Sequence, residues 1–175
     1  MKNVRLTGIA LAMAAALASG AAGAAPTSTM AVTAAITADC AIAQNAPIAF
    51  GNLDMLGSGV QSTAENIGTG SFNAICTNGT TNPKFKYTSQ NSAAGAFRLV
   101  GADATTYIVY SVHQGASTAA GTEVAYDTAE THAAFAADGT SQTLTVKAKI
   151  LPADKNGKLV QAYSDVITVT ATFDA

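Results

Sequence analysis

Two cysteines are the side chains whose type and spacing most clearly predict chemistry in this sequence. Cys40 and Cys76 are the only cysteines among its 175 residues. They lie far apart in sequence and have no histidine close to either, whereas a metal site or a redox dithiol needs closely spaced thiols or nearby imidazoles. In an oxidising compartment the pair forms a disulfide. We therefore predict a structural disulfide that stabilises the fold by roughly 3 to 4 kcal/mol.

The other polar side chains do not form a catalytic pattern. His113 and His132 stand in loop-like stretches without a cysteine or an acidic motif, so we expect two lone surface histidines. The aspartates are scattered over turns and strand ends. The sequence has no glycine-rich phosphate loop, no G-x-S-x-G elbow and no metal-binding spacing. Tryptophan is absent and aromatic residues make up only 6%, which disfavours a sugar-stacking platform. We predict a protein that is not an enzyme and needs no cofactor or metal.

Residues 1–24 have the three-part layout of a secretory signal, with Lys2 and Arg5, an uncharged run over residues 6–17, and then small residues. A membrane anchor is the alternative, but this run is shorter than the roughly 18 to 20 residues that span a bilayer. We therefore expect cleavage after Ala24. Export would also provide the oxidising compartment that a disulfide requires.

The charge of the mature chain excludes several classes of partner. Removal of the leader takes away Lys2 and Arg5, and leaves seven basic and eleven acidic side chains, a net charge of about −4. The remaining basic residues form no stripe, whereas binding to nucleic acid or anionic lipid calls for clustered Lys and Arg. No later apolar run is long enough to span a bilayer. We therefore expect no nucleic-acid partner and no membrane insertion.

The mature chain predicts one all-β domain. From residue 40 onward, short apolar stretches are separated by Gly, Asn, Asp, Ser and Thr, with no sustained helical period. Residues 129–137 could form a helical turn, although a loop with a short strand fits equally well. This spacing is typical of an immunoglobulin-like sandwich. Strands are expected over residues 46–50, 70–77, 84–88, 96–100, 106–112, 122–126, 142–150 and 163–173.

The last two predicted strands have the clearest alternation. Apolar residues alternate with Thr and Lys in both, so one face of each strand is expected to be buried. Asn156 and Gly157 between them favour a hairpin turn. We therefore expect the two strands to close the chain as an antiparallel pair. The inward residues are Leu144, Val146, Ala148 and Ile150 in the first strand, and Ile167, Val169, Ala171 and Phe173 in the second.

The segment that follows the leader also has a strand pattern. Met30, Val32, Ala34 and Ile36 alternate with Ala and Thr, so one face is apolar. If the sandwich lacks its final strand, a groove stays open beside the C-terminal strand, and this segment is available to fill the groove of another molecule by donor-strand complementation. Such head-to-tail contacts build a fibre. Alternatively, residues 29–37 pair within their own domain, and the pattern alone leaves both interpretations open.

Five stretches resemble the spore coat U domain family, which includes the subunits of archaic, Csu-type chaperone-usher pili. The resemblance covers nearly all of the mature chain. A Cys followed by an F-G motif, a second Cys, and a terminal Y-x-D before an alternating strand are specific in combination. The stretches are MAVTAAITADC at 30–40, IAFGNLD at 48–54, GSFNAIC at 70–76, TYIVYSV at 106–112 and YSDVITVTATF at 163–173.

The resemblance implies an incomplete immunoglobulin-like sandwich over residues 39–175, preceded by a donor-strand extension over residues 25–38. Cys40 and Cys76 match the disulfide of the family. The donor side chains would be Met30, Val32, Ala34 and Ile36, and the acceptor groove would be lined by Ile167, Val169, Ala171 and Phe173.

The resemblance also implies a biological role. The chain would be a structural pilin that crosses the bacterial periplasm to the cell surface, with a periplasmic chaperone, an outer-membrane usher and neighbouring pilus subunits as its partners. Its fibres would support adhesion and biofilm formation. Two alternatives stay open, namely a spore or outer coat structural protein and a self-contained extracellular carbohydrate-binding module.

Overall fold

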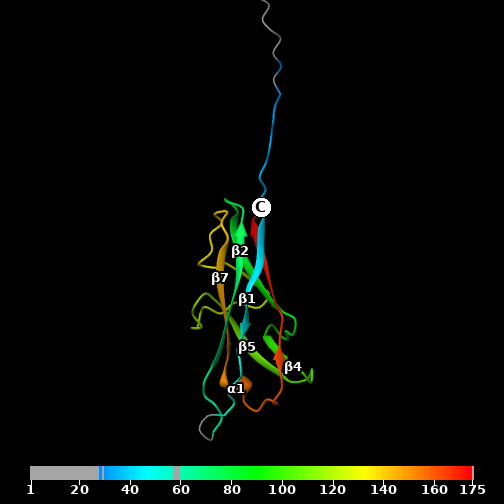
Figure 1. Ribbon diagram of the computed structural model, residues 1–175, viewed down its shortest axis with the longest axis vertical. Coiled ribbons are helices and arrows are strands. Elements are labelled where there is room, and N and C mark those ends of the chain that lie inside the picture. Colours follow the sequence, from blue (N-terminus) through cyan, green and yellow to red (C-terminus); the bar gives the residue numbers. More distant parts are fainter. Residues whose placement is uncertain (1–27, 29, 57–59, 175) are drawn as a thin grey trace, which may run out of the picture. The chain divides into compact units, whose positions relative to one another are not determined.

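The structure is a computed structural model that describes residues 28, 30–56 and 60–174 (Figure 1). The predicted leader lies outside the described residues. The chain divides into two units, one up to Ala35 and one from Ile36 onward. Residues 30–39 adopt no helix or strand, and the side chains of Met30, Val32 and Ile36 are 87 to 89% exposed. Among the described residues, no helix has the length and apolar character needed to cross a membrane.

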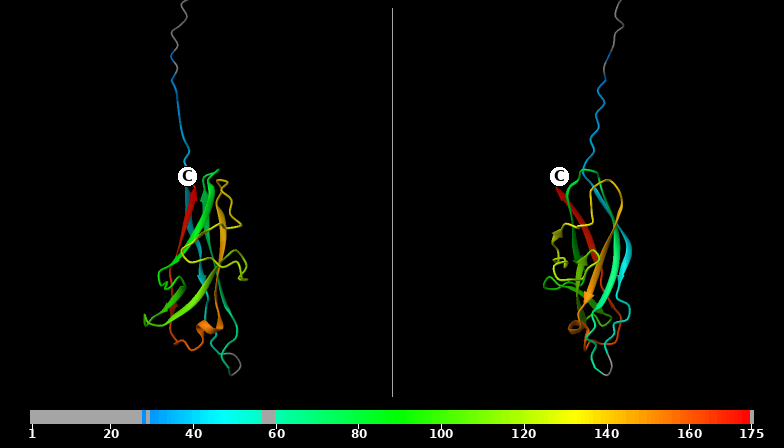
Figure 2. Two further views of the ribbon diagram at one scale, coloured as in Figure 1. Left: turned by 180° about the vertical axis from the view of Figure 1, so that it is seen from behind. Right: turned by 90° about the vertical axis from the view of Figure 1, so that its left-hand side faces the viewer.

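The second unit is the predicted all-β sandwich of two antiparallel sheets (Figures 1 and 2). Over the described residues, one sheet has the strand order β1-β2-β7-β5-β4-β8 and the other the order β6-β3-β9. The elements are β1 (Cys40–Ala49), β2 (Asn66–Cys76), β3 (Thr81–Ser89), β4 (Phe97–Gly101), β5 (Tyr107–Gln114), β6 (Ala129–Glu130), β7 (Gln142–Ile150), α1 (Pro152–Lys155), β8 (Tyr163–Ser164) and β9 (Ile167–Asp174).

The core lies between the sheets and follows the predicted alternation. All four inward residues of β7 are buried, while Lys147 and Lys149 are only half-buried. Phe72 of β2 packs edge-to-face on Phe85 and Tyr87 of β3, with ring centroids 5.4 and 6.3 Å apart, and so joins the two sheets. The buried cluster comprises Phe72, Ala74, Phe85, Tyr87, Phe97, Ile108, Tyr110, Val112, Val124, Leu144, Val146, Ala148 and Ile150.

The predicted C-terminal hairpin is wrong. β7 pairs with β2 and β5, whereas β9 pairs with β3 in the other sheet. Between them, α1 and the residues that follow carry the chain from one sheet to the other. Gly157 does have a positive φ of 76°, so the local turn signal is real. The alternation in each strand fixed which side chains face inward, but it did not fix the partner strand.

One smaller expectation needs correction, and of two open alternatives the structure shows the second, a loop with a short strand over residues 129–137. Residues 122–126 form no strand, and only Glu123 makes an isolated bridge, to His113. In the 129–137 stretch the helical turn does not form, and its first two residues are the short strand β6. Val124 of the 122–126 stretch is nevertheless buried, and its main-chain N donates to the main-chain oxygen of Val112 at 2.9 Å.

β1 approaches β2 unusually closely around Ile48. The β1–β2 register shifts between Gln44 and Ala46 and again between Ala46 and Ala49, so β1 is bulged here. A Cβ atom on Gly70 would lie 2.6 Å from Cγ1 of Ile48, and one on Gly68 would lie 2.8 Å from its Cγ2. Only glycine leaves this space free. The close approach lets Ile48 pack against the core.

Candidate functional site

An open groove lies along the edges of the two sheets. β1 is an edge strand of one sheet and β9 is an edge strand of the other, because in the described residues each has a single hydrogen-bonded neighbour, β2 and β3 respectively. Both strands contribute side chains to one cavity of about 1110 Å³, which we call the edge groove. Each strand therefore presents a row of unpaired main-chain donors and acceptors beside the groove.

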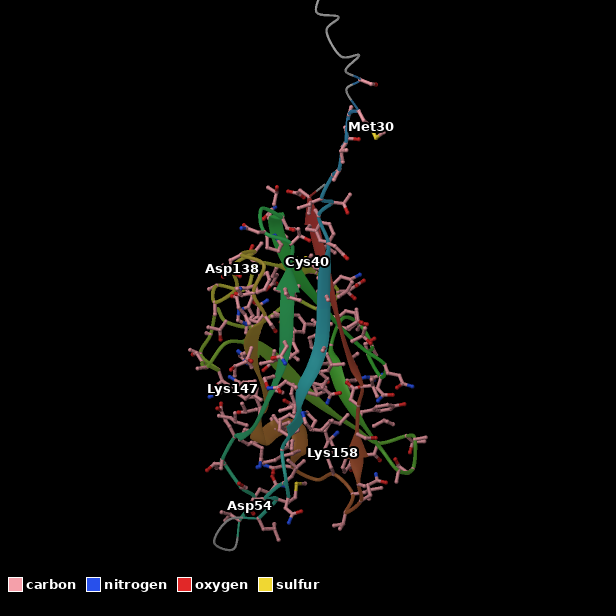
Figure 3. All side chains as sticks on the ribbon, turned by 45° about the horizontal axis from the view of Figure 1, so that its top comes forward. Met30, Cys40, Asp54, Asp138, Lys147 and Lys158 are labelled. Carbon is pink, nitrogen blue, oxygen red and sulfur yellow. A yellow bond between two sulfur atoms is a disulfide. The ribbon has the colours of Figure 1, made fainter. Side chains whose placement is uncertain are left out.

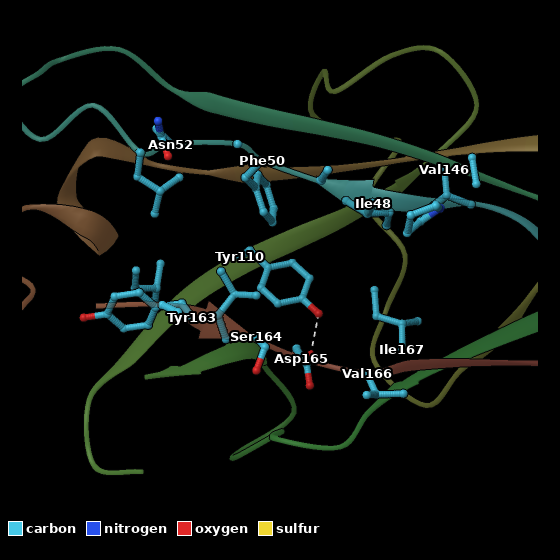
Figure 4. A pocket seen from close by; sticks show the side chains of 18 of the residues that line it. Ile48, Phe50, Asn52, Tyr110, Val146, Tyr163, Ser164, Asp165, Val166 and Ile167 are labelled. Carbon is cyan, nitrogen blue, oxygen red and sulfur yellow. Dashed lines mark hydrogen bonds between the residues drawn. The ribbon is translucent and has the colours of Figure 1, made fainter. Parts of the chain in front are cut away.

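The lining of the edge groove is largely apolar. Ile48 and Phe50 lie on the β1 side, Val166 and Ile167 lie on the opposite side, and Tyr110 lies between them (Figure 4). Residues 158–165 continue the second side beyond β9. The floor is made by core side chains of both sheets, namely Phe72, Tyr87, Ile108, Tyr110 and Val146. The groove is thus an opening into the hydrophobic core.

Asp165, the acidic residue of the Y-x-D motif, organises one end of the groove. Its Oδ2 accepts hydrogen bonds from Tyr110 Oη at 2.5 Å and Ser89 Oγ at 2.6 Å. Its Oδ1 accepts from the main-chain N and the Nδ2 of Asn91, at 3.2 and 3.0 Å. Tyr163 of the same motif donates from Oη to the main-chain oxygen of Leu159 at 2.9 Å. The motif therefore fixes the chain where it enters β9.

Two buried tyrosines line the groove in different states. The Tyr110 hydroxyl is bonded to Asp165, and its burial, together with this hydrogen bond, raises the pKa of the phenol. The Tyr87 hydroxyl is buried and has no hydrogen-bond partner among the described residues. Burial is also the main reason why the pKa of Tyr87 is raised, and the nearby charge of Glu130 adds to it. Both phenols are therefore protonated hydrogen-bond donors at neutral pH.

The predicted disulfide is confirmed. The sulfur atoms of Cys40 and Cys76 are 2.02 Å apart, and the two residues pair directly where β1 begins and β2 ends. Figure 3 labels Cys40 at the start of β1, with Asp54 and Lys158 at the far end of the domain. The bond therefore fixes the first residue of the edge strand that forms one side of the groove.

The predicted acceptor residues are only partly in the groove. Ile167 and Val169 line it, whereas Ala171 and Phe173 are not among the lining residues. Ala171 is half-buried against the core instead. The predicted donor side chains, Met30, Val32, Ala34 and Ile36, are all exposed.

Sequence reasoning missed the opposite side of the groove. Ile42, Ile48 and Phe50 of the β1 side had no predicted role in it, although IAFGNLD at 48–54 was recognised as a motif. A usable signal was the spacing of Gly68 and Gly70 in β2, because two glycines on one face of a strand indicate close approach by another chain segment.

The expectation of two surface histidines is wrong. His113 is fully buried, with Nε2 2.8 Å from Ser111 Oγ and Nδ1 3.0 Å from Thr122 Oγ1. His132 is 2% exposed and packs edge-to-face on Phe85. Desolvation is the main cause that lowers the pKa of both imidazoles. In the described part of the chain, no group of three or more His, Cys, Asp or Glu side chains is placed to hold a metal ion.

Comparison with solved structures found weak likenesses. The chain is similar to a CsuC–CsuE chaperone-tip adhesion subunit pre-assembly complex from archaic chaperone-usher Csu pili of Acinetobacter baumannii, with 16% identity and a TM-score of 0.49. It is also similar to a chaperone-tip adhesin complex of CFA/I fimbriae biogenesis, with 17% identity and a TM-score of 0.42. These matches cover 79% and 75% of this chain, but only 40% and 42% of the solved chains.

The comparison with family profiles gave a match over most of the chain. The profile of the Spore Coat Protein U domain matches residues 26–170, which include both cysteines and the start of β9. The comparison with curated proteins returned no match. Since the profile covers well over half of the sequence, the chain belongs to the Spore Coat Protein U domain family.

Proposed function

We propose that this chain is a structural subunit of a bacterial surface pilus, and that another molecule completes its sandwich by inserting a strand into the edge groove. The observation that carries the proposal is the groove itself, which opens into the core between the edge strands β1 and β9. An inserted strand would give both edges a hydrogen-bonding partner and would cover the apolar floor.

The N-terminal segment of a second copy is the occupant that we propose. Its apolar face is carried by Met30, Val32, Ala34 and Ile36, which span six residue steps, or about 20 Å for a strand. The β1 side of the groove from Ile42 to Phe50 spans eight steps, or about 26 Å. The segment therefore fits within the groove. Burial of each large apolar side chain would contribute about 1.5 to 3 kcal/mol.

Chain polymerisation follows from this arrangement. A subunit that accepts a strand in its groove still has its own exposed N-terminal segment to donate, so the contact is head-to-tail and does not close. The family resemblance further supports a periplasmic chaperone that occupies the groove before assembly, an outer-membrane usher, and fibres that serve adhesion and biofilm formation at the cell surface. We propose these partners and this location on that basis.

The experiment compares polymerisation of three forms of the mature chain, residues 25–175, by light scattering and electron microscopy. In one variant, Val32→Asp and Ile36→Asp place two charges on the apolar face of the donor segment. The matched control carries Thr33→Asp and Thr37→Asp, which add the same charge to the other face. We expect the control and the native chain to form fibres and the first variant to stay monomeric, because a carboxylate in an apolar groove costs several kcal/mol.

A second measurement tests completion of the fold directly. The monomeric Val32→Asp, Ile36→Asp chain is mixed with an excess of a peptide spanning Thr27 to Thr37, and thermal unfolding is followed. We expect the melting temperature to rise with peptide concentration, since the peptide binds the folded state only. Fibres from the donor variant, or a monomer whose melting temperature ignores the peptide, would contradict the proposal and favour a self-contained module.

A further inference from the structure

Asp39, the residue before β1, is held by hydrogen bonds to the residue that follows β2. Its main-chain oxygen accepts from the main-chain N of Thr77 at 2.9 Å and from Thr77 Oγ1 at 3.3 Å. Its Oδ1 accepts from the main-chain N of Cys40 at 2.8 Å. These bonds, which we call the entry clamp, continue the β1–β2 ladder one residue beyond the Cys40–Cys76 pair. While the clamp is intact, a donor segment that folds back toward β1 must make its turn before Asp39.

The two faces of β1 decide which register would let a donor segment fill the groove of its own domain. Ile42 and Gln44 line the edge groove, whereas Ala43 between them is exposed. The even-numbered residues at the start of β1 therefore face the groove. Residues that pair directly across two strands lie on the same face of the sheet. To bury its apolar face, Ile36 must pair with an even-numbered residue, and the nearest in sequence is Cys40.

The connection is too short for a turn in that register. Only three residues, 37 to 39, separate Ile36 from Cys40. With those two residues paired, Thr37 lies opposite Asp39, and Ala38 alone is left for the turn. Two residues are the shortest usual hairpin loop. Pairing further along β1 would move the centre of the turn into the clamp or into β1 itself.

The two other turns each fail one condition. A three-residue loop over residues 37–39 needs Asp39 to leave the clamp and to take the left-handed conformation of the third loop position. In the structure Asp39 has no positive φ. A two-residue loop of Thr37 and Ala38 keeps the clamp, but it pairs Ile36 with Asp39. This shift of one residue turns the whole apolar face of the segment outward.

A donor segment from a second copy is free of this restriction. It is not tied to β1 of the acceptor by three residues, so it can enter the groove with its apolar face inward while the clamp of the acceptor stays intact. The same apolar side chains would be buried in a closed monomer and in a fibre, so their burial favours neither arrangement. The turn and the entry clamp are what differ between the two.

We propose that the entry clamp and the three-residue length of the connection deny each subunit its own groove, and thereby direct its donor segment to a second copy. Asp39 and Thr77 are positioning residues in this arrangement. The inference rests on the proposed function. It implies that the connection is one residue too short for self-completion, and that a single added residue converts a fibre subunit into a closed monomer.

The test changes the length of the connection in the mature chain, residues 25–175. In the long variant the dipeptide Asn-Gly takes the place of Ala38, which provides a two-residue turn with Thr37 opposite Asp39 and the clamp intact. Asn-Gly strongly favours such a turn. The matched control, Thr37→Asn with Ala38→Gly, has the same Asn-Gly turn at the native length, where a hairpin would turn the apolar face outward. Light scattering gives the oligomeric state, and circular dichroism follows thermal unfolding.

We expect the control to form fibres as the native chain does, and the long variant to stay monomeric. Its melting temperature should reach that of the Val32→Asp, Ile36→Asp chain saturated with the donor peptide, residues 27–37, because its own tethered segment fills the groove. Adding Val32→Asp and Ile36→Asp to the long variant should lower its melting temperature to that of the empty-groove chain. Asp39→Gly at the native length should raise the monomeric fraction, because glycine adopts the left-handed conformation without strain.

Fibres from the long variant at the native yield would overturn the inference and leave the proposed function intact. Loss of fibres in the matched control would also overturn it, since the length of the connection would then not be decisive. A monomeric long variant that melts no higher than the empty-groove chain would do the same, because its groove would not be filled.

The native chain separates failure of the inference from failure of the proposed function. A native chain that stays monomeric, while its Val32→Asp, Ile36→Asp form binds the donor peptide, would show that the native segment fills its own groove. That result would overturn the inference and leave strand acceptance by the groove intact. Failure of the Val32→Asp, Ile36→Asp form to bind the donor peptide would overturn the proposed function, and the inference with it.

Discussion

Tyr110 and Asp165 join the two sheets of the sandwich through one hydrogen bond of 2.5 Å, from Tyr110 Oη on β5 to Asp165 Oδ2 just before β9. The same carboxylate accepts from Ser89 and Asn91 at the end of β3. One acidic side chain thus fixes one end of the edge groove by accepting hydrogen bonds from three residues, which lie in β5 and at the end of β3.

Replacement of this carboxylate should destabilise the domain. We expect Asp165→Ala to lower the free energy of unfolding by about 3 kcal/mol, because it leaves the partly buried hydroxyls of Ser89 and Tyr110 without their acceptor. Urea unfolding of the monomeric chain measures this. Asp54→Ala, at an exposed position, is the control and should change stability by less than about 0.5 kcal/mol. Equal stability of the two variants would contradict the role of Asp165.

Loss of the disulfide should lower the free energy of unfolding by an amount similar to that expected for Asp165→Ala. A cross-link across 36 residues of separation contributes roughly 4 kcal/mol in the loop-entropy estimate. We expect the double variant Cys40→Ser, Cys76→Ser to unfold at a correspondingly lower urea concentration than the oxidised native chain. The native chain treated with a reductant should unfold at nearly the same urea concentration as the variant. An unchanged unfolding midpoint would show that the cross-link has no structural role.

Gly70→Ala should disturb the β1 side of the groove. The added methyl group would lie 2.6 Å from Cγ1 of Ile48 and 2.9 Å from the main-chain oxygen of Ala46, so β1 must move. We expect a loss of about 1 to 3 kcal/mol in stability, in the range seen for overpacked cores, and weaker peptide binding. Thr69→Ala, at the exposed residue next to it, serves as the control. If the clash is the cause, Ile48→Ala should recover part of the stability lost in Gly70→Ala.

The buried histidines should make stability depend on pH. His132 Nδ1 accepts a hydrogen bond from the main-chain N of Ala134 at 3.3 Å, so protonation there breaks this bond and buries a charge. The folded-state pKa of His132 is lowered by desolvation, and an unfolded chain has a histidine pKa near 6.5. The unfolded state therefore takes up the proton first as pH falls. The associated stability is fully present above about pH 6.5 and is lost below it.

Urea unfolding between pH 8 and pH 5 measures this dependence. Each buried histidine can contribute a slope of up to about 1.4 kcal/mol per pH unit below pH 6.5, and His113 contributes in the same direction because its pKa is also lowered by burial. His132→Asn should reduce the slope of the free energy of unfolding against pH, and the slope that remains should be the contribution of His113. A slope that is the same in the native chain and in His132→Asn would contradict the assignment.

The sequence was sufficient for the all-β class, the disulfide and the inward faces of β7 and β9, because alternation and cysteine count depend on local pattern. It was not sufficient for strand partners. Lys155 illustrates the reason, since it is a charged residue beside the turn at Asn156 and Gly157 and is fully buried, with Nζ bonded to Asn66 Oδ1 at 2.5 Å. Contacts between residues 89 positions apart in sequence leave no trace in local periodicity.

Only one side of the groove, the β9 side, could be predicted from the sequence. Ile167 and Val169 were found because β9 alternates cleanly, but the β1 side depends on the bulge at Ala46 and on the glycines beneath Ile48. Burial of the histidines was missed for a related reason. His113 lies within β5 and His132 lies in the segment after β6, and the polar and small residues beside both gave no sign that the imidazoles are buried.

The position of the Cys40–Cys76 bond has a mechanical consequence. The N-terminal segment enters the domain at Cys40, and any tension applied through this segment reaches β1 at its first residue. An edge strand pulled at its end would otherwise peel from its neighbour one hydrogen bond at a time. The disulfide transfers the load directly to the last residue of β2, a strand held on both sides by β1 and β7. The covalent bond thus places the force on the interior of the sheet and not on the hydrogen bonds of an edge strand.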